Sequence, residues 1–471
     1  MPTHAYEAVD GFRRPDREMA LSVKQRGTAS LAVLLSVVFA LACGDSPRNV
    51  ILISIDTLRA DFLGCYGYDR PTSPASDQLA GDGVLFEDVL ATSPWTPPSH
   101  ASMLTGLYPS HHGLKPKDSS MIGDAIRSDV PTLAEVLGKH GYETAAFVRS
   151  VVLREESGFG RGFATFVPVD FDYRSRGPSP VSDLALEWLR DRSERPFFLF
   201  LHYYDAHSDY RSLPHYEERF VESYDGIADG TTRQLQRVRR GLVELDDEDA
   251  RHLANLYAAG VRQVDDEVAR ILQHLDEARI SDQTLIILTS DHGEGFLEHG
   301  SVLHGRTFYE EITRVPLVLR GPRIPAGLRV SRPASLVDIV PTIVGLVGIE
   351  DVLSTDGIDL SPSWSVGAAE ISDDRYLFAE ADWGNAVPDA RRAVRHGSWK
   401  LHVDLSNGET QLYDLAGDRA EQRDLAKHEQ SKVARLRAQL ATLVEAEPEQ
   451  SPAPGLSAEE REELRRLGYL E

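Results

Sequence analysis

NVILISID, residues 49–56, and TLIILTSD, residues 284–291, are two apolar runs of strand length that each end in an aspartate. Similar apolar runs occupy residues 196–205 and 314–321. Longer amphipathic stretches separate these runs, which is typical of an α/β domain with a largely parallel sheet. We therefore predict an α/β fold with a large, mostly parallel sheet that is flanked by helices on both faces.

The remaining elements follow from residue patterns along the chain. TLAEVLGKHG, residues 132–141, predicts a helix closed by a glycine, and 254–280 predicts a longer helix with one apolar face. Beyond about residue 356 the chain changes to short alternating pieces with Gly- and Asp-rich turns, which predict a smaller C-terminal antiparallel sheet. A helix is expected over about 428–445. The expected domains are a larger α/β domain, 47–355, and a C-terminal α+β subdomain, 356–471.

Composition excludes several classes of protein. Fifty Lys and Arg against 74 Asp and Glu give a net charge of −24, which repels phosphate backbones and argues against nucleic-acid binding. The chain has only two cysteines, so a disulfide framework, a Cys-rich zinc site and an iron–sulfur cluster are excluded. Any metal must therefore be held by oxygen and nitrogen ligands.

Residues 1–43 have the layout of a targeting segment. The apolar run SLAVLLSVVFALA, residues 30–42, is shorter than the about 20 residues that span a bilayer, and Lys24 and Arg26 precede it. The following Cys43 resembles the lipidated residue of a bacterial lipoprotein. We expect an exported protein of the bacterial periplasm or cell envelope, anchored by lipid at Cys43. Cleavage by an ordinary signal peptidase and a buried apolar helix are the alternatives.

The aspartates at the two strand ends are candidate metal ligands. Asp56 and Asp291 lie where ligands bind in open α/β sheets, beyond the carboxyl ends of the strands, and His292 follows directly. Two carboxylates and one imidazole suit Mn, Mg or Zn, and Ca less well because of the nitrogen. Each aspartate alone would more often be a turn or cap residue. The pair with His292 favours a metal site.

A third element is SPWTPPSHASMLTG, residues 93–106. Pro97 and Pro98 predict a helix that starts at Ser99, with Thr96 just ahead of it. The free N–H groups of the first turn would hold a phosphate or sulfate, and a cation-bound Thr96 hydroxyl would act as nucleophile. Alternatively, Thr96 or Ser99 only caps the helix.

In order along the chain, six blocks resemble the sulfatases, metal-dependent ester hydrolases of the alkaline-phosphatase superfamily. The blocks are residues 55–68, 96–113, 201–210, 290–300, 308–322, and 391–401 with 412–426. This resemblance implies one divalent metal ion on Asp56, Asp291, His292 and Thr96, with Thr96 at the nucleophile position. It also implies that His207 and His304 contact or protonate the ester.

The chain departs from the family pattern at the residues that matter for chemistry. Sulfatases convert a Cys or Ser at the signature position to formylglycine, but Thr96 cannot become that aldehyde, so no formylglycine is expected. His100 stands where the signature has Arg and is a further candidate catalytic residue. Thr57 replaces the usual second Asp, and residues 143–153 replace the block with a sulfate-binding Lys. A phosphorylated or sulfated Thr96 would need a second in-line attack.

Other polar residues near these blocks have less specific interpretations. Asp205, with His207 and His304, could contribute to a second metal site. His202 alternates with apolar residues in a strand run and is more often a core histidine. Arg59 and Arg306 could contact an anionic substrate bidentately, although a lone Arg after a strand is usually a surface salt-bridge partner.

We therefore expect an exported, metal-dependent hydrolase that cleaves sulfate or phosphate esters by in-line attack of Thr96. Its substrate would be a small molecule, glycan or lipid ester, with no nucleic-acid partner and membrane contact only through the lipid anchor. A phosphodiesterase, a phosphoryl transferase acting on envelope substrates, and a catalytically degenerate anion-binding lipoprotein remain alternatives. The sulfate or phosphate preference, the organic part of the substrate and the oligomeric state are open.

Overall fold

The computed structural model describes residues 46–115, 125–169, 180–350, 353–364, 374–383 and 389–444. The predicted targeting segment, residues 1–43, lies outside this range, and the predicted domain boundaries stay predictions. None of the helices in the described ranges is long and apolar enough to cross a membrane.

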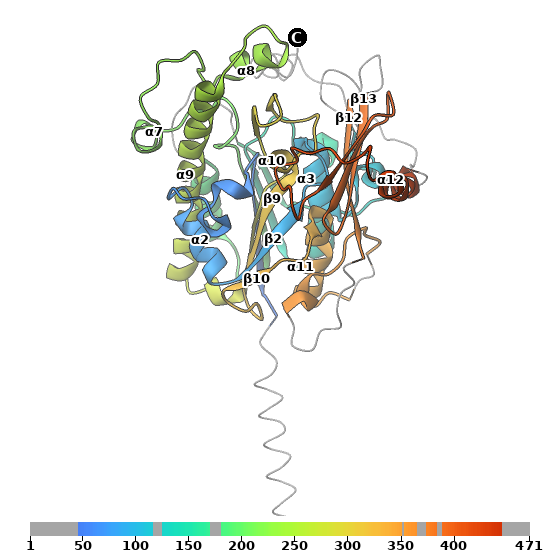
Figure 1. Cartoon of the computed structure of the whole chain (residues 1–471). Helices are drawn as coiled ribbons and strands as arrows, with labels where there is room; N and C mark the ends of the chain where they lie inside the picture. Colours follow the sequence, from blue (N-terminus) through green and yellow to red (C-terminus); the bar gives the residue numbers. More distant parts are fainter. Residues whose placement is uncertain are drawn as a thin grey trace, which may run out of the picture. The chain divides into compact units, whose positions relative to one another are not determined.

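A nine-stranded sheet forms the centre of the molecule, as predicted (Figure 1). Its main path runs β10-β2-β9-β6-β1-β5-β3-β4, and β11 pairs with β2. The strand bounds are β1 Asn49–Ile55, β2 Val84–Leu90, β3 Glu143–Val148, β4 Thr165–Pro168, β5 Phe197–Tyr203, β6 Thr284–Thr289, β9 Arg314–Arg320, β10 Leu328–Val330 and β11 Ala334–Ser335. β9 is antiparallel to both neighbours, β2 and β6, whereas the other pairs are parallel.

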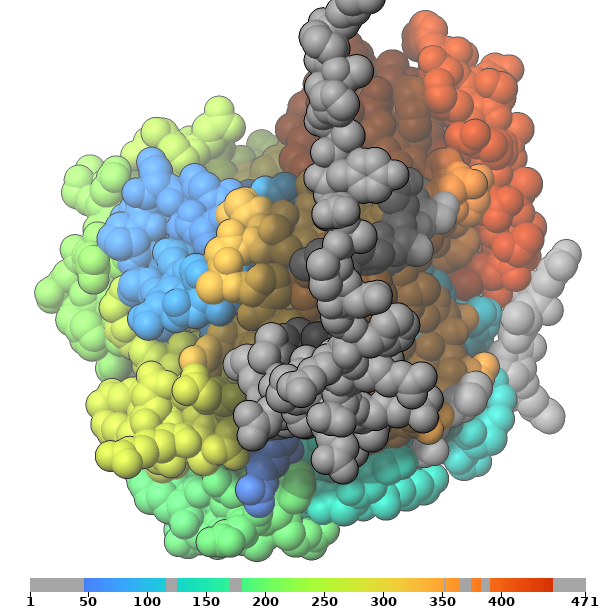
Figure 2. Space-filling model, turned by 90° about the horizontal axis from the view of Figure 1, so that it is seen from below, coloured from blue at the N-terminus to red at the C-terminus, as the bar shows by residue number. Residues whose placement is uncertain are grey.

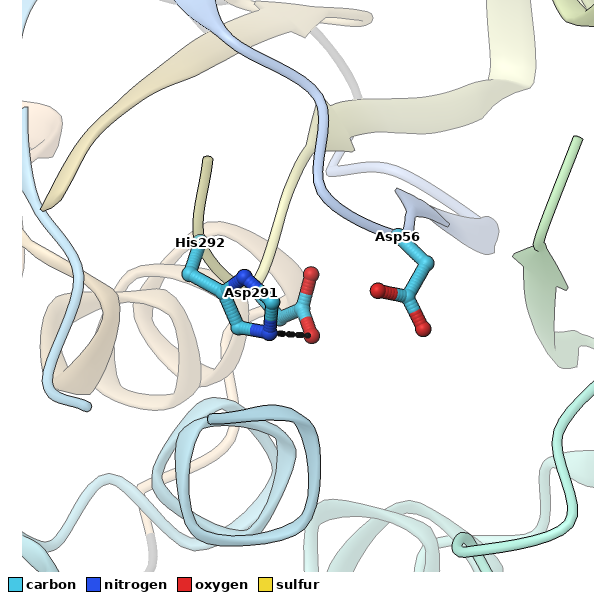
Figure 3. A group of neighbouring side chains, drawn as sticks. All are labelled: Asp56, Asp291 and His292. Carbon is cyan, nitrogen blue, oxygen red and sulfur yellow. Dashed lines mark ion pairs between the residues drawn. The ribbon is translucent and has the colours of Figure 1, made fainter. Parts of the chain in front are cut away.

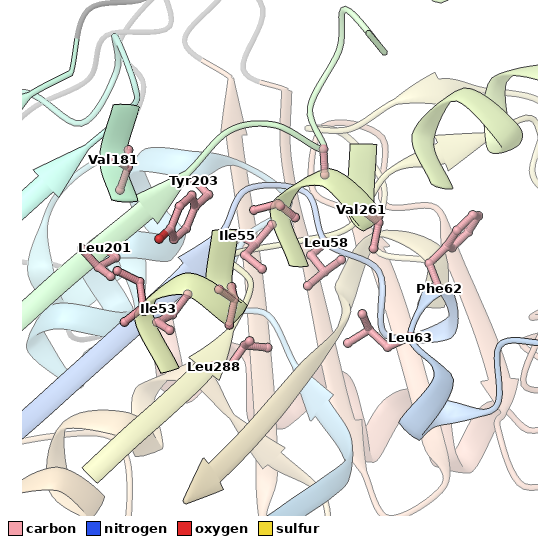
Figure 4. Close-up of a cluster of buried hydrophobic side chains, with 14 of the residues drawn as sticks. Ile53, Ile55, Leu58, Phe62, Leu63, Val181, Leu201, Tyr203, Val261 and Leu288 are labelled. Carbon is pink, nitrogen blue, oxygen red and sulfur yellow. The ribbon is translucent and has the colours of Figure 1, made fainter. Parts of the chain in front are cut away.

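Two apolar clusters cover the two faces of the sheet. Along β1, Ile51, Ile53 and Ile55 belong to one cluster, and Val50 and Leu52 belong to the other, because successive side chains point to opposite faces. The first cluster packs against helices α6 (Pro180–Asp191) and α9 (Asp247–Glu277), and part of it is shown in Figure 4. The second packs against α3 (Thr96–Thr105), α5 (Leu133–Lys139) and α11 (Ile339–Val347). Helices on both faces were predicted.

Two helices begin earlier than predicted. α9 begins at Asp247 rather than 254, since the Asp246 carboxylate accepts hydrogen bonds from the N–H groups of Glu248 and Asp249. α3 begins at Thr96 rather than Ser99. Proline fits the first turn of a helix, where N–H groups have no partner within the helix, so Pro97 and Pro98 lie inside α3.

The C-terminal antiparallel sheet is present as predicted, in the order β12-β13-β14-β15. Its strands are Tyr376–Trp383, Asp389–His396, Trp399–Asp404 and Thr410–Asp414, and helix α12 (Gln430–Val444) packs on it. Buried ion pairs join this sheet to the main one. Arg395 binds Asp88 of β2, and Lys400 Nζ lies 2.9 Å from Glu310 Oε1, in the short helix α10 (Glu310–Thr313) before β9.

β1 starts at the end of the sheet seen from below in Figure 2, where the first described residues appear in blue. β5 and β6 run parallel to β1 on its two sides, so all three strands end at the opposite edge. The short strands β7 (Gly295–Phe296) and β8 (Val302–Leu303) follow β6 and pair with each other. Helix α8 (Thr232–Arg239) packs against β8, and helix α7 (Pro214–Phe220) packs against α9.

Candidate active site

Asp56, Asp291 and His292 come together at the carboxyl ends of β1 and β6 (Figure 3). Ser54 of β1 is paired with Thr289 of β6, so the residues that follow both strands leave the sheet side by side. One ligand atom from each of the three residues lies within 4.8 Å of the others, and all three side chains are buried. The sequence prediction that they converge is therefore reproduced by the structure.

The hydrogen bonding of this group suits a cation. Among the described residues, neither carboxylate oxygen of Asp56 has a hydrogen-bond donor, and neither does Asp291 Oδ2. His292 Nδ1 lies 3.0 Å from the Gly293 carbonyl oxygen, which requires the proton on Nδ1 and leaves Nε2 as an acceptor. Nε2 is 3.2 Å from Asp291 Oδ2, so two acceptors face each other. A divalent cation would satisfy both.

Burial gives these ligands unusual titration behaviour in the metal-free protein. Burial raises the pKa of Asp56 well above its ordinary value, and the charges of Asp291 and Glu294 raise it further. Burial also raises the pKa of Asp291 and lowers that of His292. Burying the two carboxylates and the imidazole without a cation destabilises the folded protein, because the ionised carboxylates repel each other. A bound cation would remove this destabilisation.

Gly293 is required by a close approach of two backbone segments. A Cβ atom on this residue would lie 2.1 Å from the carbonyl oxygen of Glu311, just before β9. The Gly293 N–H donates a 2.7 Å hydrogen bond to the Ile312 carbonyl. The glycine after His292 therefore allows the ligand loop to pack against the chain that enters β9.

Thr96, the candidate nucleophile, is the first residue of α3 and is buried. Its Oγ1 lies 3.2 Å from His292 Nε2, within the ligand group. The helix start offers fewer N–H groups to an anion than the sequence suggested. Pro97 and Pro98 have none, and the Ser99 N–H donates to the Trp95 carbonyl. Positive charge for an anionic substrate must therefore come largely from a cation and from side chains.

His100 lies one helical turn behind Thr96 and is completely buried. Its Nδ1 donates a 2.9 Å hydrogen bond to the Thr96 carbonyl, and its Nε2 is 2.9 Å from Ser54 Oγ. Burial lowers the pKa of His100, which keeps the ring neutral. Both ring nitrogens contact protein atoms, so the structure places His100 as a support of Thr96. Its predicted catalytic role stays a prediction.

His207 and His304 lie beside the ligand group. The His304 ring centroid is 4.3 Å from that of His292 and 5.0 Å from that of His207. His304 Nδ1 donates a 3.0 Å hydrogen bond to Glu294 Oε1, which leaves Nε2 as an acceptor. Burial lowers the pKa of both His207 and His304 to about 3. In the free protein these rings are neutral, so an anionic substrate must bind before either is an effective acid.

Sequence reasoning missed two residues of this site. His202, interpreted as a core histidine, has its Nε2 3.4 Å from Asp56 Oδ2 while its Nδ1 donates to the Arg149 carbonyl. Its pairing with Ser54, a polar pair within two apolar strands, is the signal that could have revealed it. Glu294 is completely buried and positions His304. Only the loop geometry after β6 brings it there.

The structure changes the interpretation of two other residues, Arg59 and Asp205. Arg59 is neither an exposed salt-bridge partner nor a free anion ligand, because it is buried and its guanidinium binds Asp61, at 2.7 Å, and Glu298. Asp205 Oδ1 accepts hydrogen bonds from Arg149, at 3.2 Å, and Gln263, at 3.1 Å. In the described part of the chain, Asp205 does not join a second group of metal ligands.

Comparison with known proteins identifies the family. A family model described as Sulfatase matches residues 48–349, more than half of the chain. The chain belongs to the sulfatase family. It is thus a sulfatase-like ester hydrolase, and enzymes of this family bind a divalent metal, in agreement with the ligand group formed by Asp56, Asp291 and His292.

Relatives of this sulfatase-family chain act on different esters. It is 25% identical over 430 residues to the delta 4,5-hexuronate-2-O-sulfatase of Bacteroides thetaiotaomicron, covering 83% of this chain and 87% of the relative. It is 26% identical over 441 residues to the choline-sulfatase of Rhizobium meliloti, covering 81% and 82%. Its fold is similar to that of the phosphonate monoester hydrolase of Agrobacterium radiobacter, with a TM-score of 0.68, 23% identity and coverage of 85% and 96%.

Metal-induced stabilisation of this sulfatase-family protein should grow with pH. The pKa values of Asp56 and Asp291 are raised by folding, so the metal-free protein loses stability as the pH rises from the ordinary carboxyl range through their folded pKa values. A cation binds the ionised carboxylates and removes this loss. We expect the rise in Tm on adding Mn²⁺ to be larger at pH 8 than at pH 5. A metal-induced shift independent of pH would contradict this assignment.

Proposed function

We propose that this protein is a divalent-metal-dependent hydrolase of phosphate or sulfate esters in which Thr96 Oγ1 is the nucleophile. The observation that carries this proposal is the position of Thr96 Oγ1, 3.2 Å from His292 Nε2 within the group of Asp56, Asp291 and His292. A hydroxyl in this position would coordinate the same cation as these three residues. An ester bound there would present its phosphorus or sulfur to Thr96.

Asp56, Asp291 and His292 would hold the cation. When bound, a divalent ion lowers the pKa of a coordinated hydroxyl and polarises an ester oxygen. His100 supports the Thr96 carbonyl, which orients the first turn of α3 toward the ligand group. Glu294 fixes the tautomer of His304, whose Nε2 is then free to exchange a proton with the leaving group or with the attacking water.

Phosphate esters are the preferred substrates in this proposal. A threonine cannot form the formylglycine of working sulfatases, so the covalent adduct on Thr96 must be released by a second in-line attack. Threonine and serine nucleophiles of the superfamily use that route on phosphoesters and phosphodiesters. The fold similarity to a phosphonate monoester hydrolase is compatible with this preference. Because the named relatives are sulfatases, sulfate esters are tested as well.

The test is an assay of phenyl phosphate, phenyl sulfate and a bis-aryl phosphodiester with Mn²⁺, Mg²⁺ or Zn²⁺, followed by mass spectrometry. We expect turnover of at least one phosphate ester and a phosphoryl adduct on Thr96. Absence of turnover for every ester and metal, with Mn²⁺ and anions still raising the Tm, would support a degenerate binding protein instead. A modified acceptor in place of free phosphate would indicate group transfer.

We also propose that the protein is exported and anchored by lipid at Cys43. The support is the sequence of residues 24–45, with two basic residues, an apolar run and the Cys-Gly-Asp that follows. Metabolic labelling with a fatty acid should label the wild-type chain but not Cys43→Ala, with Cys65→Ala as control. Label that persists in Cys43→Ala would overturn the anchor.

A further inference from the structure

Helix α8 brings an arginine without a partner to the edge of the site. α8 packs against β8, and His304 follows β8 directly. Arg239 is the last residue of α8 and is partly buried, whereas Arg233 and Arg237 of the same helix are exposed. Within the described ranges, Arg239 forms no hydrogen bond and no ion pair. A partly buried guanidinium group without a partner is costly, so it fits an anion that binds from outside the chain.

Arg306 lies on the same edge, two residues after His304, and faces the C-terminal sheet. It lines a cavity of about 460 Å³, where Arg391 and Lys427 lie with the carboxylates of Asp404, Glu409 and Asp424. Arg391, on β13, donates a hydrogen bond of 3.3 Å to the Arg306 carbonyl. A volume of this size is in the range of small-ligand pockets. The cavity therefore offers room, beside Arg306, for the organic part of a substrate.

The charges of these residues act on one another and on the reaction centre. Burial lowers the pKa of Arg239 to about 10, and the charge of Arg306 contributes to this lowering. The charge of Arg239 in turn lowers the pKa of His304. The charge of Glu294 opposes the repulsion between the arginines; its Oε1 binds His304, and its Oε2 has no hydrogen-bond partner among the described residues. In a chain with 74 acidic residues, two arginines that repel each other beside the site are suited to an anionic group of the ligand.

We propose that Arg239 and Arg306 form a binding site for a second anionic group of the substrate, a carboxylate or another sulfate or phosphate, beyond the ester that Thr96 attacks. This inference rests on the proposed function and narrows its substrate class to esters with at least two anionic groups. The scarcity of free N–H groups at the start of α3 agrees with it, because side chains must then supply the positive charge. The organic part of the substrate extends toward the cavity of the C-terminal sheet.

A binding experiment tests this site without any turnover. Full-length protein with Mn²⁺ is titrated with benzenesulfonate or benzene-1,3-disulfonate, and the affinity of each is obtained from the rise in Tm. We expect the wild type to bind the disulfonate about 10- to 100-fold more tightly, as charge-assisted hydrogen bonds to arginine predict. Arg239→Gln should abolish this preference, Arg239→Lys should keep part of it, and the exposed control Arg237→Gln should retain it.

A kinetic experiment connects the site to the reaction. The ratio of kcat/KM for 3-carboxyphenyl phosphate to that for phenyl phosphate is measured in the same variants, or for the matching sulfates if those are the esters turned over. Arg239→Gln should lower this ratio at least about tenfold relative to wild type. Equal affinity for the two sulfonates in the wild type, or an equal loss of preference in Arg237→Gln, would overturn the proposal. Failure of the proposed function alone would abolish turnover and leave the sulfonate preference.

Discussion

Thr96→Ala is expected to lower kcat for the best ester at least about 10³-fold, because it removes the α3 hydroxyl that lies 3.2 Å from His292 Nε2. The variant should also show no covalent adduct by mass spectrometry. Mn²⁺ should still raise its Tm, since Asp56, Asp291 and His292 are unchanged. Steady-state kinetics with the metal-loaded protein gives the first result directly.

Thr96→Ser is the matched control for this prediction. Serine keeps the hydroxyl and removes only a methyl group, so its kcat should lie much closer to wild type and its adduct should appear at residue 96. A Thr96→Ala variant that turns over esters as fast as wild type would show that water or another residue attacks. Rescue by serine separates the loss of a nucleophile from the loss of packing around a buried threonine.

Asp56→Asn is expected to abolish most of the Mn²⁺-induced rise in Tm while leaving the metal-free protein at least as stable as wild type at pH 8. Neither Asp56 oxygen has a donor in the described residues, and its pKa is raised by burial and by Asp291 and Glu294. At pH 8 the ionised carboxylate therefore opposes folding, and asparagine removes that charge. In the wild type, metal at 100 times its Kd should stabilise by about 2.7 kcal/mol.

Asp88→Asn provides the comparison, since Asp88 is also a buried aspartate. Its carboxylate binds the guanidinium group of Arg395, which joins β2 to the C-terminal sheet. Asparagine has no charge and only one acceptor oxygen, so the buried guanidinium group of Arg395 would lose its counter-charge. We expect a loss of about 3–5 kcal/mol in the free energy of unfolding and an unchanged rise in Tm with Mn²⁺. If Asp56→Asn destabilised the metal-free protein by a similar amount, Asp56 would be a structural residue and the metal assignment would be wrong.

The sequence carries most of the information on the sheet and on the three ligands. Apolar runs identify the strands, and the carboxyl ends of neighbouring parallel strands meet, so the residue pattern alone is enough to bring Asp56 and Asp291 together. The direction of β9 could not be predicted, because a buried strand is apolar whichever way it runs. The start of α3 was wrong by one turn, since a proline pair is compatible with a position before or inside the first turn.

The rest of the site depends on loops. His202 is polar in a buried strand, a pattern that a core histidine shares, and only pairing with β1 places it beside Asp56. Glu294 reaches the site through the segment after β6, and Arg239 through α8. The local sequence pattern of these segments does not say where they pack. Tertiary contacts, rather than local propensity, decide where those side chains lie.

The pairing of β1 with β6 also determines when, during synthesis of the chain, the metal ligands become available. Asp56 directly follows β1, and its partners Asp291 and His292 follow β6, which is made much later in synthesis. A chain that has not yet reached residue 292 lacks at least one of the three ligands, so this site can bind its ion only after residue 292 has been made. The ions available from that stage on, together with the two carboxylates and the imidazole, therefore decide which metal the enzyme carries.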